Sequence, residues 1–290
     1  MLSYVVGFLA FMLVGYNPLV QLLQGLAPGP PRIQRTPRPH LQEELLALED
    51  RNGSLCSQDD QYRVHIFSRE PLVIYVENFL TSDERDHLLE VSNPLFRPST
   101  VTDDGGASTH RDAAIRDSEV AVIPRTDTVR CIEDRARSLQ GWRDEVWVER
   151  LRVQRYGPRG HYHHHFDWSS SRGGWGRVSS FMVWVDDDNG KLRGGGTEFP
   201  SLIPRNHSRW CAFIDCGPNA NLNAGIEADI GVAGKVSGVV FKPVPGNAVY
   251  WENFRPDGSG RGYDETWHAG LPVIEGTKVG LNIWSWGRIE

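Results

Sequence analysis

The sequence predicts an α+β protein whose C-terminal half is a double-stranded β-helix, or jelly roll. Two amphipathic helical stretches come first, and several short strand-like segments follow, separated by turns rich in Gly, Asn, Asp and Pro. The ten Trp and 30 Gly residues among 290 agree with this prediction, because large rings need a core and glycines permit tight turns. We therefore expect flanking helices before the sheets, and an N-terminal hydrophobic segment before both.

Local patterns define the individual elements in chain order. Residues 72–80 are enriched in β-branched and aromatic side chains, which predicts a strand. Thr81 and Glu84 predict a capping box that starts a helix running through Val91, and residues 127–139 carry apolar side chains at helical spacing. Later strands are expected at 146–156, 177–185, 238–244, 247–254 and 278–286.

The first 24 residues are predicted to be a signal peptide or a signal-anchor helix. Residues 2–14 are uncharged and apolar, and the stretch stays largely apolar through Leu23, close to the roughly 20 residues that cross a bilayer. A buried core helix is the weaker alternative, because a Pro-rich stretch follows at once. No Lys or Arg precedes the run, which is atypical of a signal peptide, whereas three arginines follow it: Arg32, Arg35 and Arg38.

The remainder divides into a tether, residues 25–60, and a single domain, residues 61–290. The prolines of the tether are incompatible with a helix or a central strand. Two N-glycosylation sequons, at Asn52 and Asn206, favour entry into the secretory pathway, with the endoplasmic reticulum membrane or lumen as the expected location. Four cysteines allow three disulfide pairings, which the sequence leaves open; they are Cys56, Cys131, Cys211 and Cys216.

Net charge argues against one class of partner. The chain carries a formal charge of −6 and has a pI near 5.9, so no overall basic field attracts nucleic acid. Nothing in the pattern indicates an obligate protein partner, and the N-terminal segment is the expected contact with a membrane.

A histidine-rich motif, HYHHHFD at 161–167, is the strongest chemical signal. On a strand, His165 and Asp167 point to the same side, and a third ligand from elsewhere completes the two-His, one-carboxylate set that binds Fe(II). Taken alone, the His165–Asp167 tripeptide is weak evidence for a metal site, since a His-rich surface loop can have the same sequence pattern. His268 supplies a third ligand, and Lys278, ten residues later, opens the last apolar strand, where a buried ammonium needs an anionic partner such as a dicarboxylate.

Four blocks of sequence resemble a known family. They are RYGPRGHYHHHFD, GGGTEFP, PGNAVYWENF and ETWHAG followed by Lys278. The region from about residue 68 onward is similar to the catalytic domain of the prolyl 4-hydroxylase α-subunit family of Fe(II)/2-oxoglutarate dioxygenases. The resemblance implies Fe(II), 2-oxoglutarate, O₂ and L-ascorbate, with His165, Asp167 and His268 as iron ligands and Lys278 pairing with the distal carboxylate of 2-oxoglutarate.

The same resemblance implies roles for four more residues. Tyr156 and Thr197 correspond to family positions beside that carboxylate. Trp284 matches an aromatic of the co-substrate pocket, and Tyr162 matches a position in the substrate cleft.

The expected activity is hydroxylation of proline in peptide or protein substrates. Hydroxylation of a small molecule is the alternative, because the chain shows no counterpart of the separate peptide-binding domain of the animal collagen enzymes and has a long segment at 201–244. A catalytically inactive binding module is disfavoured, since every matched ligand is intact.

Overall fold

The computed structural model describes residues 32–48, 56, 62–102, 109–169, 172–204, 208–216 and 238–289. Residues from Gln34 onward form one compact unit. The predicted N-terminal segment, residues 1–24, and the sequon asparagines Asn52 and Asn206 lie outside the described residues. Among the helices that are described, we find none with both the length and the apolar character needed to cross a bilayer.

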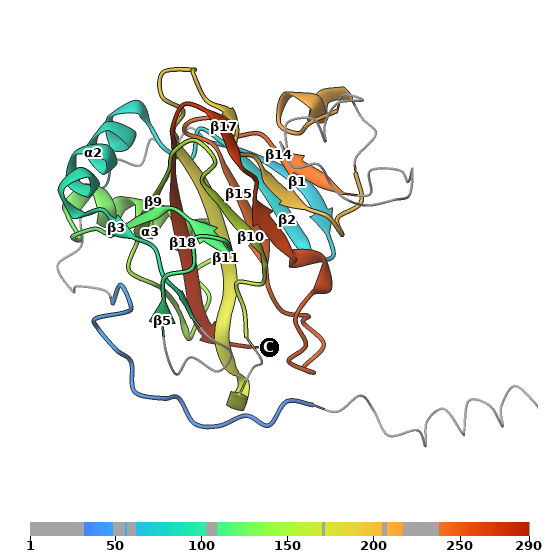
Figure 1. Cartoon of the computed structure of the whole chain (residues 1–290). Coiled ribbons are helices and arrows are strands. Elements are labelled where there is room, and N and C mark those ends of the chain that lie inside the picture. The colour runs from blue at the N-terminus through green and yellow to red at the C-terminus, as the bar shows by residue number, and fades with distance from the viewer. Residues whose placement is uncertain are drawn as a thin grey trace, which may run out of the picture. The chain divides into compact units, whose positions relative to one another are not determined.

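The larger of two main sheets contains nine strands within the described residues, and its neighbouring strands run antiparallel (Figure 1). Its strands are β1 (Arg63–Arg69), β2 (Leu72–Glu77), β3 (Arg97–Pro98), β7 (Glu119–Val122), β8 (Val146–Val148), β9 (Arg152–Tyr156), β11 (Trp175–Asp186), β15 (Ala248–Glu252) and β18 (Lys278–Arg288). The spatial order is β1-β2-β15-β11-β18-β9-β7-β3, and β8 pairs with β18. Strands far apart in the chain are therefore neighbours in the sheet.

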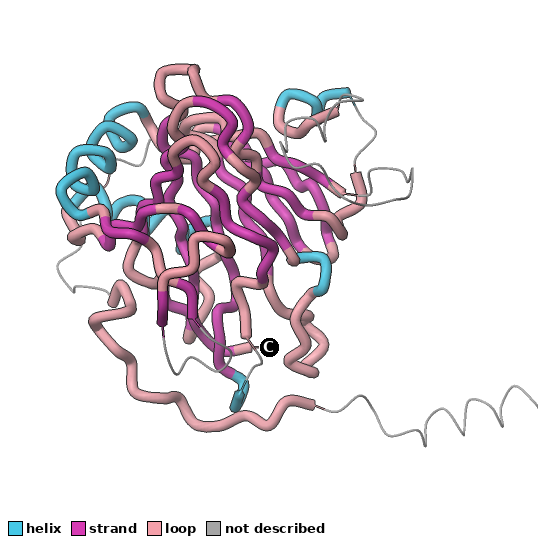
Figure 2. The backbone as a smooth tube through the Cα atoms, in the orientation of Figure 1, coloured by secondary structure: helices cyan, strands magenta, loops and turns pink. Residues whose placement is uncertain are grey.

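The smaller sheet has five short strands within the described residues, in the order β14-β13-β16-β10-β6. These are β6 (Arg116–Asp117), β10 (His161–His165), β13 (Thr197–Phe199), β14 (Val239–Phe241) and β16 (His268–Gly270). Two further pairs join β4 (Val101–Thr102) to β5 (Thr109–His110), and β12 (Arg193–Gly194) to β17 (Val273–Glu275). Short 3₁₀ turns occur at Asn93–Leu95, Arg172–Gly174, Ser208–Ala212 and Asp264–Thr266, and Figure 2 shows the strands and helices by type.

An aromatic cluster joins the two sheets face to face. Trp251 of the larger sheet packs edge-on against Phe199 of the smaller one, with ring centroids 5.2 Å apart. Tyr75 and Phe241 stack across the interface, with ring centroids 6.0 Å apart, and all four of these rings are buried. Two sheets packed over a shared core confirm the predicted double-stranded β-helix.

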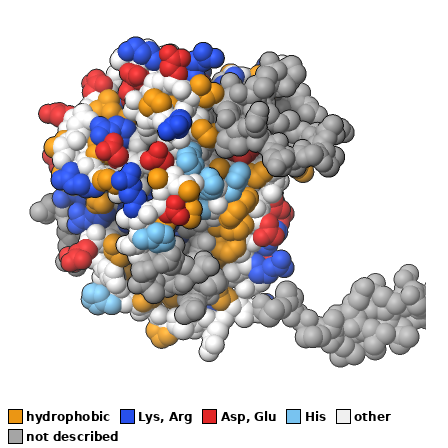
Figure 3. All heavy atoms as spheres, viewed as in Figure 1, with side chains coloured by type: hydrophobic (Ala, Val, Ile, Leu, Met, Phe, Trp, Pro, Cys, Tyr) orange, Lys and Arg blue, Asp and Glu red, His pale blue; other side chains and the backbone are white. Residues whose placement is uncertain are grey.

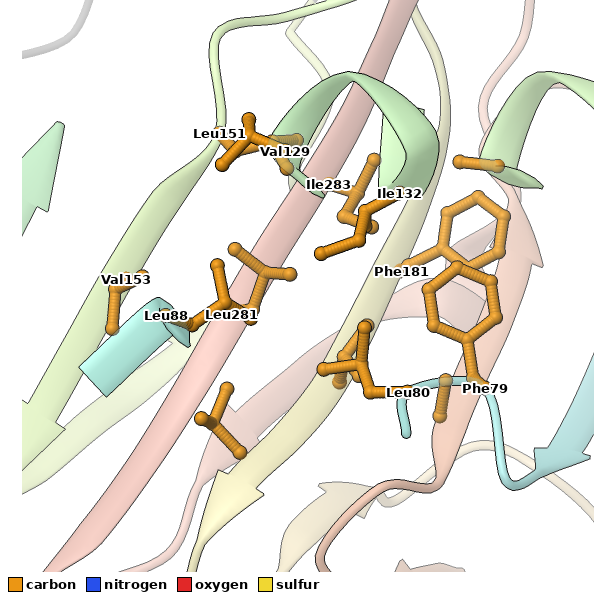
Figure 4. Packing of buried hydrophobic residues seen from close by; sticks show 14 of the residues in the cluster. Phe79, Leu80, Leu88, Val129, Ile132, Leu151, Val153, Phe181, Leu281 and Ile283 are labelled. Atoms are coloured by element: carbon orange, nitrogen blue, oxygen red, sulfur yellow. The ribbon is translucent and has the colours of Figure 1, made fainter. Parts of the chain in front are cut away.

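Two helices cover the other face of the larger sheet. They are α2 (Ser82–Ser92) and α3 (Asp127–Leu139), which lie together on one side in Figure 1. Leu88 of α2 and Ile132 of α3 pack into one buried cluster with Leu281 of β18 and its neighbours (Figure 4). The apolar stripe of each helix therefore anchors it to the sheet.

The start of α2 has the predicted capping box. The Thr81 hydroxyl accepts a hydrogen bond from the Glu84 backbone N–H, and the Glu84 carboxylate accepts one from the Thr81 N–H. Glu84 also pairs with Arg135 of α3 at 2.9 Å, so the cap residue ties the two helices together.

Most predicted elements lie where the sequence places them, with one exception. The prediction of a single strand over 146–156 is wrong, because the chain leaves the ladder between β8 and β9. There the Arg150 N–H donates to the Leu45 carbonyl and Leu46 bridges to Glu149. The segment at Leu45 and Leu46 thus pairs with the chain at a point where the sequence alone shows a continuous strand-like pattern.

Part of the predicted tether packs against the domain. The Thr36 N–H donates to the Gly173 carbonyl, and the Ala47 N–H to the Val148 carbonyl. Two disulfides resolve the pairing that the sequence left open, namely Cys56–Cys131 and Cys211–Cys216. The first of them ties the tether to α3.

Leu88 provides a test of the helix-to-sheet packing. Its side chain has no solvent exposure, so we expect Leu88→Ala to lower the free energy of unfolding by about 2–5 kcal/mol, through lost burial and the cavity left behind. Leu45, which is 47% exposed, is the control, and Leu45→Ala should change stability by no more than about 0.5 kcal/mol. Denaturant titration measures both, and equal losses would contradict the packing described here.

Candidate active site

Three potential metal ligands converge on the inner side of the smaller sheet. His165 at the end of β10 is the cross-strand partner of His268 at the start of β16, and Asp167 follows β10. One ligand atom from each of the three residues lies within 4.8 Å of the others. The Asp167 carboxylate oxygens are 3.6 Å from His165 Nε2 and 3.9 Å from His268 Nε2. The structure therefore brings together the three ligands that the sequence predicts. Several histidine side chains lie close together on the face seen in Figure 3.

Backbone carbonyls set the orientation of both imidazole rings. His165 Nδ1 lies 2.8 Å from the carbonyl oxygen of His163, and His268 Nδ1 lies 2.8 Å from that of Thr266. Because a carbonyl oxygen only accepts, each Nδ1 carries the hydrogen. The lone pair of each Nε2 is left facing Asp167, as a metal-binding imidazole requires.

The charges around Asp167 favour its ionised form. Burial by itself raises the pKa of Asp167, but the interactions with His165, His268 and Arg177 outweigh it and hold the pKa below its usual range. Burial, together with repulsion from His165, lowers the pKa of His268 to about 4. Near neutral pH the site therefore offers a carboxylate and a neutral imidazole, both ready to bind a cation.

Trp284 and Arg177 support the Asp167 side of the site. Trp284 Nε1 donates to Asp167 Oδ2 at 2.9 Å, and Arg177 Nη1 donates to the Asp167 backbone carbonyl at 3.0 Å. The Arg177 guanidinium lies 3.8 Å from the Trp284 ring centroid and forms a two-point ion pair with Glu149. Trp284, predicted as an aromatic of the co-substrate pocket, thus contacts a potential metal ligand directly and orients its carboxylate.

Lys278 is buried in the core with a single acceptor among the described residues. Its side chain is 1% exposed, its Nζ donates to the Gly195 carbonyl at 2.8 Å, and it lies 4.6 Å from the Tyr156 ring centroid. Gly194 and Gly195 have φ of 76° and 72°, a left-handed turn that presents this carbonyl. Burial lowers the pKa of Lys278 to about 8. An ammonium has three hydrogens to donate, and only one has an acceptor among the described residues, so this buried charge favours binding of an anion.

The Lys278 ammonium lies close to the potential metal ligands. A Cβ built on Gly270 would be 3.7 Å from Lys278 Nζ, and Gly270 follows His268 by two residues on β16, about 7 Å along a strand. Gly270 pairs with Tyr162 on one side and Thr197 on the other. A short dicarboxylate can therefore reach from the metal to the ammonium, with the predicted residues Thr197, Tyr156 and Tyr162 around it.

A family model for the 2OG-Fe(II) oxygenase superfamily matches residues 151–286, a span that contains all three ligands and Lys278. Over this span the chain is similar to members of that superfamily. Among curated proteins, this chain is 29% identical over 247 residues to the probable prolyl 4-hydroxylase 10 of Arabidopsis thaliana, covering 81% of this chain and 75% of the relative. It is 27% identical over 237 residues to prolyl 4-hydroxylase 5 of the same plant, covering 76% and 70%.

Solved structures include similar chains at lower identity. The viral collagen prolyl hydroxylase vCPH of Paramecium bursaria Chlorella virus-1, in a 2OG complex, is 20% identical with a TM-score of 0.49, covering 74% of this chain and 96% of that one. A Pseudomonas putida prolyl-4-hydroxylase is 15% identical with a TM-score of 0.47, covering 77% and 95%.

The residues present fit the cofactors of a 2-oxoglutarate-dependent dioxygenase. Two imidazole nitrogens and a carboxylate oxygen are the donor set of non-haem Fe(II), and they leave positions open for other ligands. The buried ammonium of Lys278 fits the distal carboxylate of 2-oxoglutarate, the co-substrate used with O₂ by this class. The chain is therefore a prolyl 4-hydroxylase-like, 2-oxoglutarate-dependent dioxygenase.

Sequence reasoning missed several polar residues beside the site, among them Arg177, Glu149, Arg152 and Gln154. A signal for two of them was present. Side chains alternate along a strand, so placing Tyr156 inward also places Gln154 and Arg152 inward on β9. In the structure Gln154 is 2% exposed and accepts the Tyr156 hydroxyl hydrogen bond at 2.6 Å.

The lowered pKa of Lys278 predicts a pH dependence of 2-oxoglutarate binding. Only the protonated amine attracts the carboxylate, and in the free protein it predominates below about pH 8. We expect affinity to weaken as pH rises through 8 toward 9.5, by up to about tenfold per pH unit. Titration of the Zn(II)-loaded protein by tryptophan fluorescence measures this. Lys278→Arg, which stays charged throughout, should give a flat profile, and a flat profile for the wild type would contradict the assignment.

Proposed function

We propose that this dioxygenase hydroxylates proline in peptide or protein substrates, using Fe(II), 2-oxoglutarate and O₂, with L-ascorbate as an accessory reductant. The observation that carries the proposal is the position of the three potential metal ligands. They lie close to the buried Lys278, whose Nζ is beside Gly270, two residues after His268. The curated relatives support the choice of proline, since two of them carry the name prolyl 4-hydroxylase and match over more than two thirds of both chains.

The chain's own side chains have separable tasks in this proposal. His165, Asp167 and His268 hold the metal, and Lys278 with Thr197 orients the co-substrate. Trp284 fixes the carboxylate of Asp167. Bound together, the metal, 2-oxoglutarate and O₂ supply the oxidant that inserts oxygen into a C–H bond.

Mass spectrometry of candidate products tests the proposal. Purified protein with Fe(II), ascorbate and 2-oxoglutarate should add one oxygen atom to proline in a peptide library, and the product should be absent without 2-oxoglutarate. If 2-oxoglutarate is consumed while a small molecule is oxygenated and every proline peptide stays unchanged, the substrate is that small molecule and not proline.

We further propose that the protein is held in the endoplasmic reticulum membrane or lumen by residues 1–24, as a glycoprotein whose catalytic domain faces away from the cytosol. The apolar N-terminal run with arginines after it supports this, as do the two sequons. The two disulfides are typical of an oxidising compartment. Protease protection in intact microsomes and a mass shift after glycosidase treatment test it, and a protease-accessible, unglycosylated protein would refute it.

A further inference from the structure

Three arginines gather beside the metal site, and we call Arg116, Arg152 and Arg177 the arginine cluster. Arg177 and Arg152 both lie against the ring of Trp284, with guanidinium carbons 3.8 and 5.4 Å from its centroid. Arg116 lies 4.5 Å from the centroid of the Tyr162 ring. All three side chains remain partly accessible to solvent.

The arginine cluster carries more positive charge than its ion-pair partners neutralise. Arg177 is paired with Glu149, but within the described part of the chain neither Arg116 nor Arg152 forms an ion pair. Arg116 Nη2 and Arg152 Nε are buried donors with no hydrogen-bond partner. Burial lowers the pKa of Arg152, and repulsion from Arg177 and Arg116 adds to that effect against the attraction of Glu149. Such an arrangement favours binding of an anion.

The rings that carry the cluster also touch the metal ligands. Trp284 donates a hydrogen bond to Asp167, and the Tyr162 ring stacks on His165 with centroids 3.8 Å apart. An anion held by the arginines therefore lies next to the reacting centre. It is not the co-substrate's distal carboxylate, because that group has its own partner in the buried ammonium of Lys278.

We propose that the arginine cluster binds a carboxylate of the substrate, so that the enzyme selects a proline with an acidic group next to it. This inference rests on the proposed function for the identity of the target residue. The planar guanidinium forks match a carboxylate in two-point geometry. The carboxylate has two possible sources with the same chemistry, an Asp or Glu side chain flanking the proline or the terminal carboxylate of a peptide that ends in proline.

Binding of matched peptides to the Zn(II)- and 2-oxoglutarate-loaded protein tests the proposal without turnover. The peptides are blocked at both ends and differ only in Glu, Gln or Lys beside a single proline. Measured by fluorescence anisotropy, the Glu peptide should bind about tenfold more tightly than the Gln peptide, with the Lys peptide weakest, and the difference should shrink at high salt. A peptide ending in an unblocked proline shows which source of carboxylate is preferred.

Variants then identify the residues responsible. Arg152→Gln should reduce the preference for Glu over Gln to within about twofold, and Arg116→Gln is an independent second loss of charge. Arg152→Lys should retain part of the preference, because it keeps the charge without the fork. The matched control is Arg155→Gln on the same strand, since Arg155 faces away, pairs with Glu119 at 2.8 Å and should leave the preference intact.

Two results overturn the inference, namely equal binding of the Glu and Gln peptides by the wild type, or an unchanged preference in both Arg152→Gln and Arg116→Gln. Failure of the proposed function is distinguishable. The test uses a Glu peptide and a Gln peptide in which alanine replaces the proline. If the Glu peptide still binds better, and no proline peptide is oxygenated in the turnover assay, the anion site stands but proline is not the target.

Discussion

Replacing Asp167 by alanine should abolish both stoichiometric Fe(II) binding and turnover of 2-oxoglutarate. Three side chains are positioned to hold the metal, and Asp167 is the carboxylate among them, so its loss leaves only two imidazoles to hold a divalent ion. His165→Ala and His268→Ala should have the same outcome for the same reason. Isothermal titration with Fe(II) under anaerobic conditions measures binding, and succinate formation measures turnover.

His164 offers a control within the same motif. Its side chain points away from the metal ligands and pairs with Glu198 at 2.8 Å, so His164→Ala should retain metal binding and turnover. If the Asp167→Ala protein kept full turnover, the assignment of the three ligands would be wrong.

Lys278→Ala should weaken 2-oxoglutarate binding by roughly 30- to 3000-fold. Loss of a desolvated, charge-assisted contact typically costs about 2–5 kcal/mol, and each 1.4 kcal/mol is a factor of ten. Lys278 is 1% exposed and donates to only one acceptor among the described residues. Its contact with the co-substrate carboxylate is therefore shielded from water, which makes the loss of that contact costly. Fluorescence titration with 2-oxoglutarate on the Zn(II)-loaded protein measures the change.

The metal site provides the internal control for Lys278. Fe(II) affinity should stay the same in Lys278→Ala, because the ammonium is not a ligand, and Lys278→Arg should recover part of the co-substrate affinity. An apparent KM for 2-oxoglutarate within about twofold of wild type would show that Lys278 has no contact with the co-substrate.

Local sequence patterns determined much of this protein. The capping residues Thr81 and Glu84 and the apolar spacing of 127–139 predict where the two helices lie, because helical hydrogen bonds and cap contacts join residues within about four positions of one another. Likewise the i, i+2 spacing of His165 and Asp167 places both on one side of β10 and its extension. The motifs and their order were sufficient to indicate Fe(II) and 2-oxoglutarate.

The tertiary structure decided what depends on contacts between distant segments. The register of β10 against β16 sets His268 opposite His165. The packing of the two sheets decides that Lys278 lies beside Gly270, with a backbone carbonyl as its one acceptor among the described residues. The gathering of Arg116, Arg152 and Arg177, the two disulfides and the break in the strand at 149–151 arise in the same way. Period-two alternation shows which side of a strand a residue faces, but only the pairing of strands from distant parts of the chain determines what it faces.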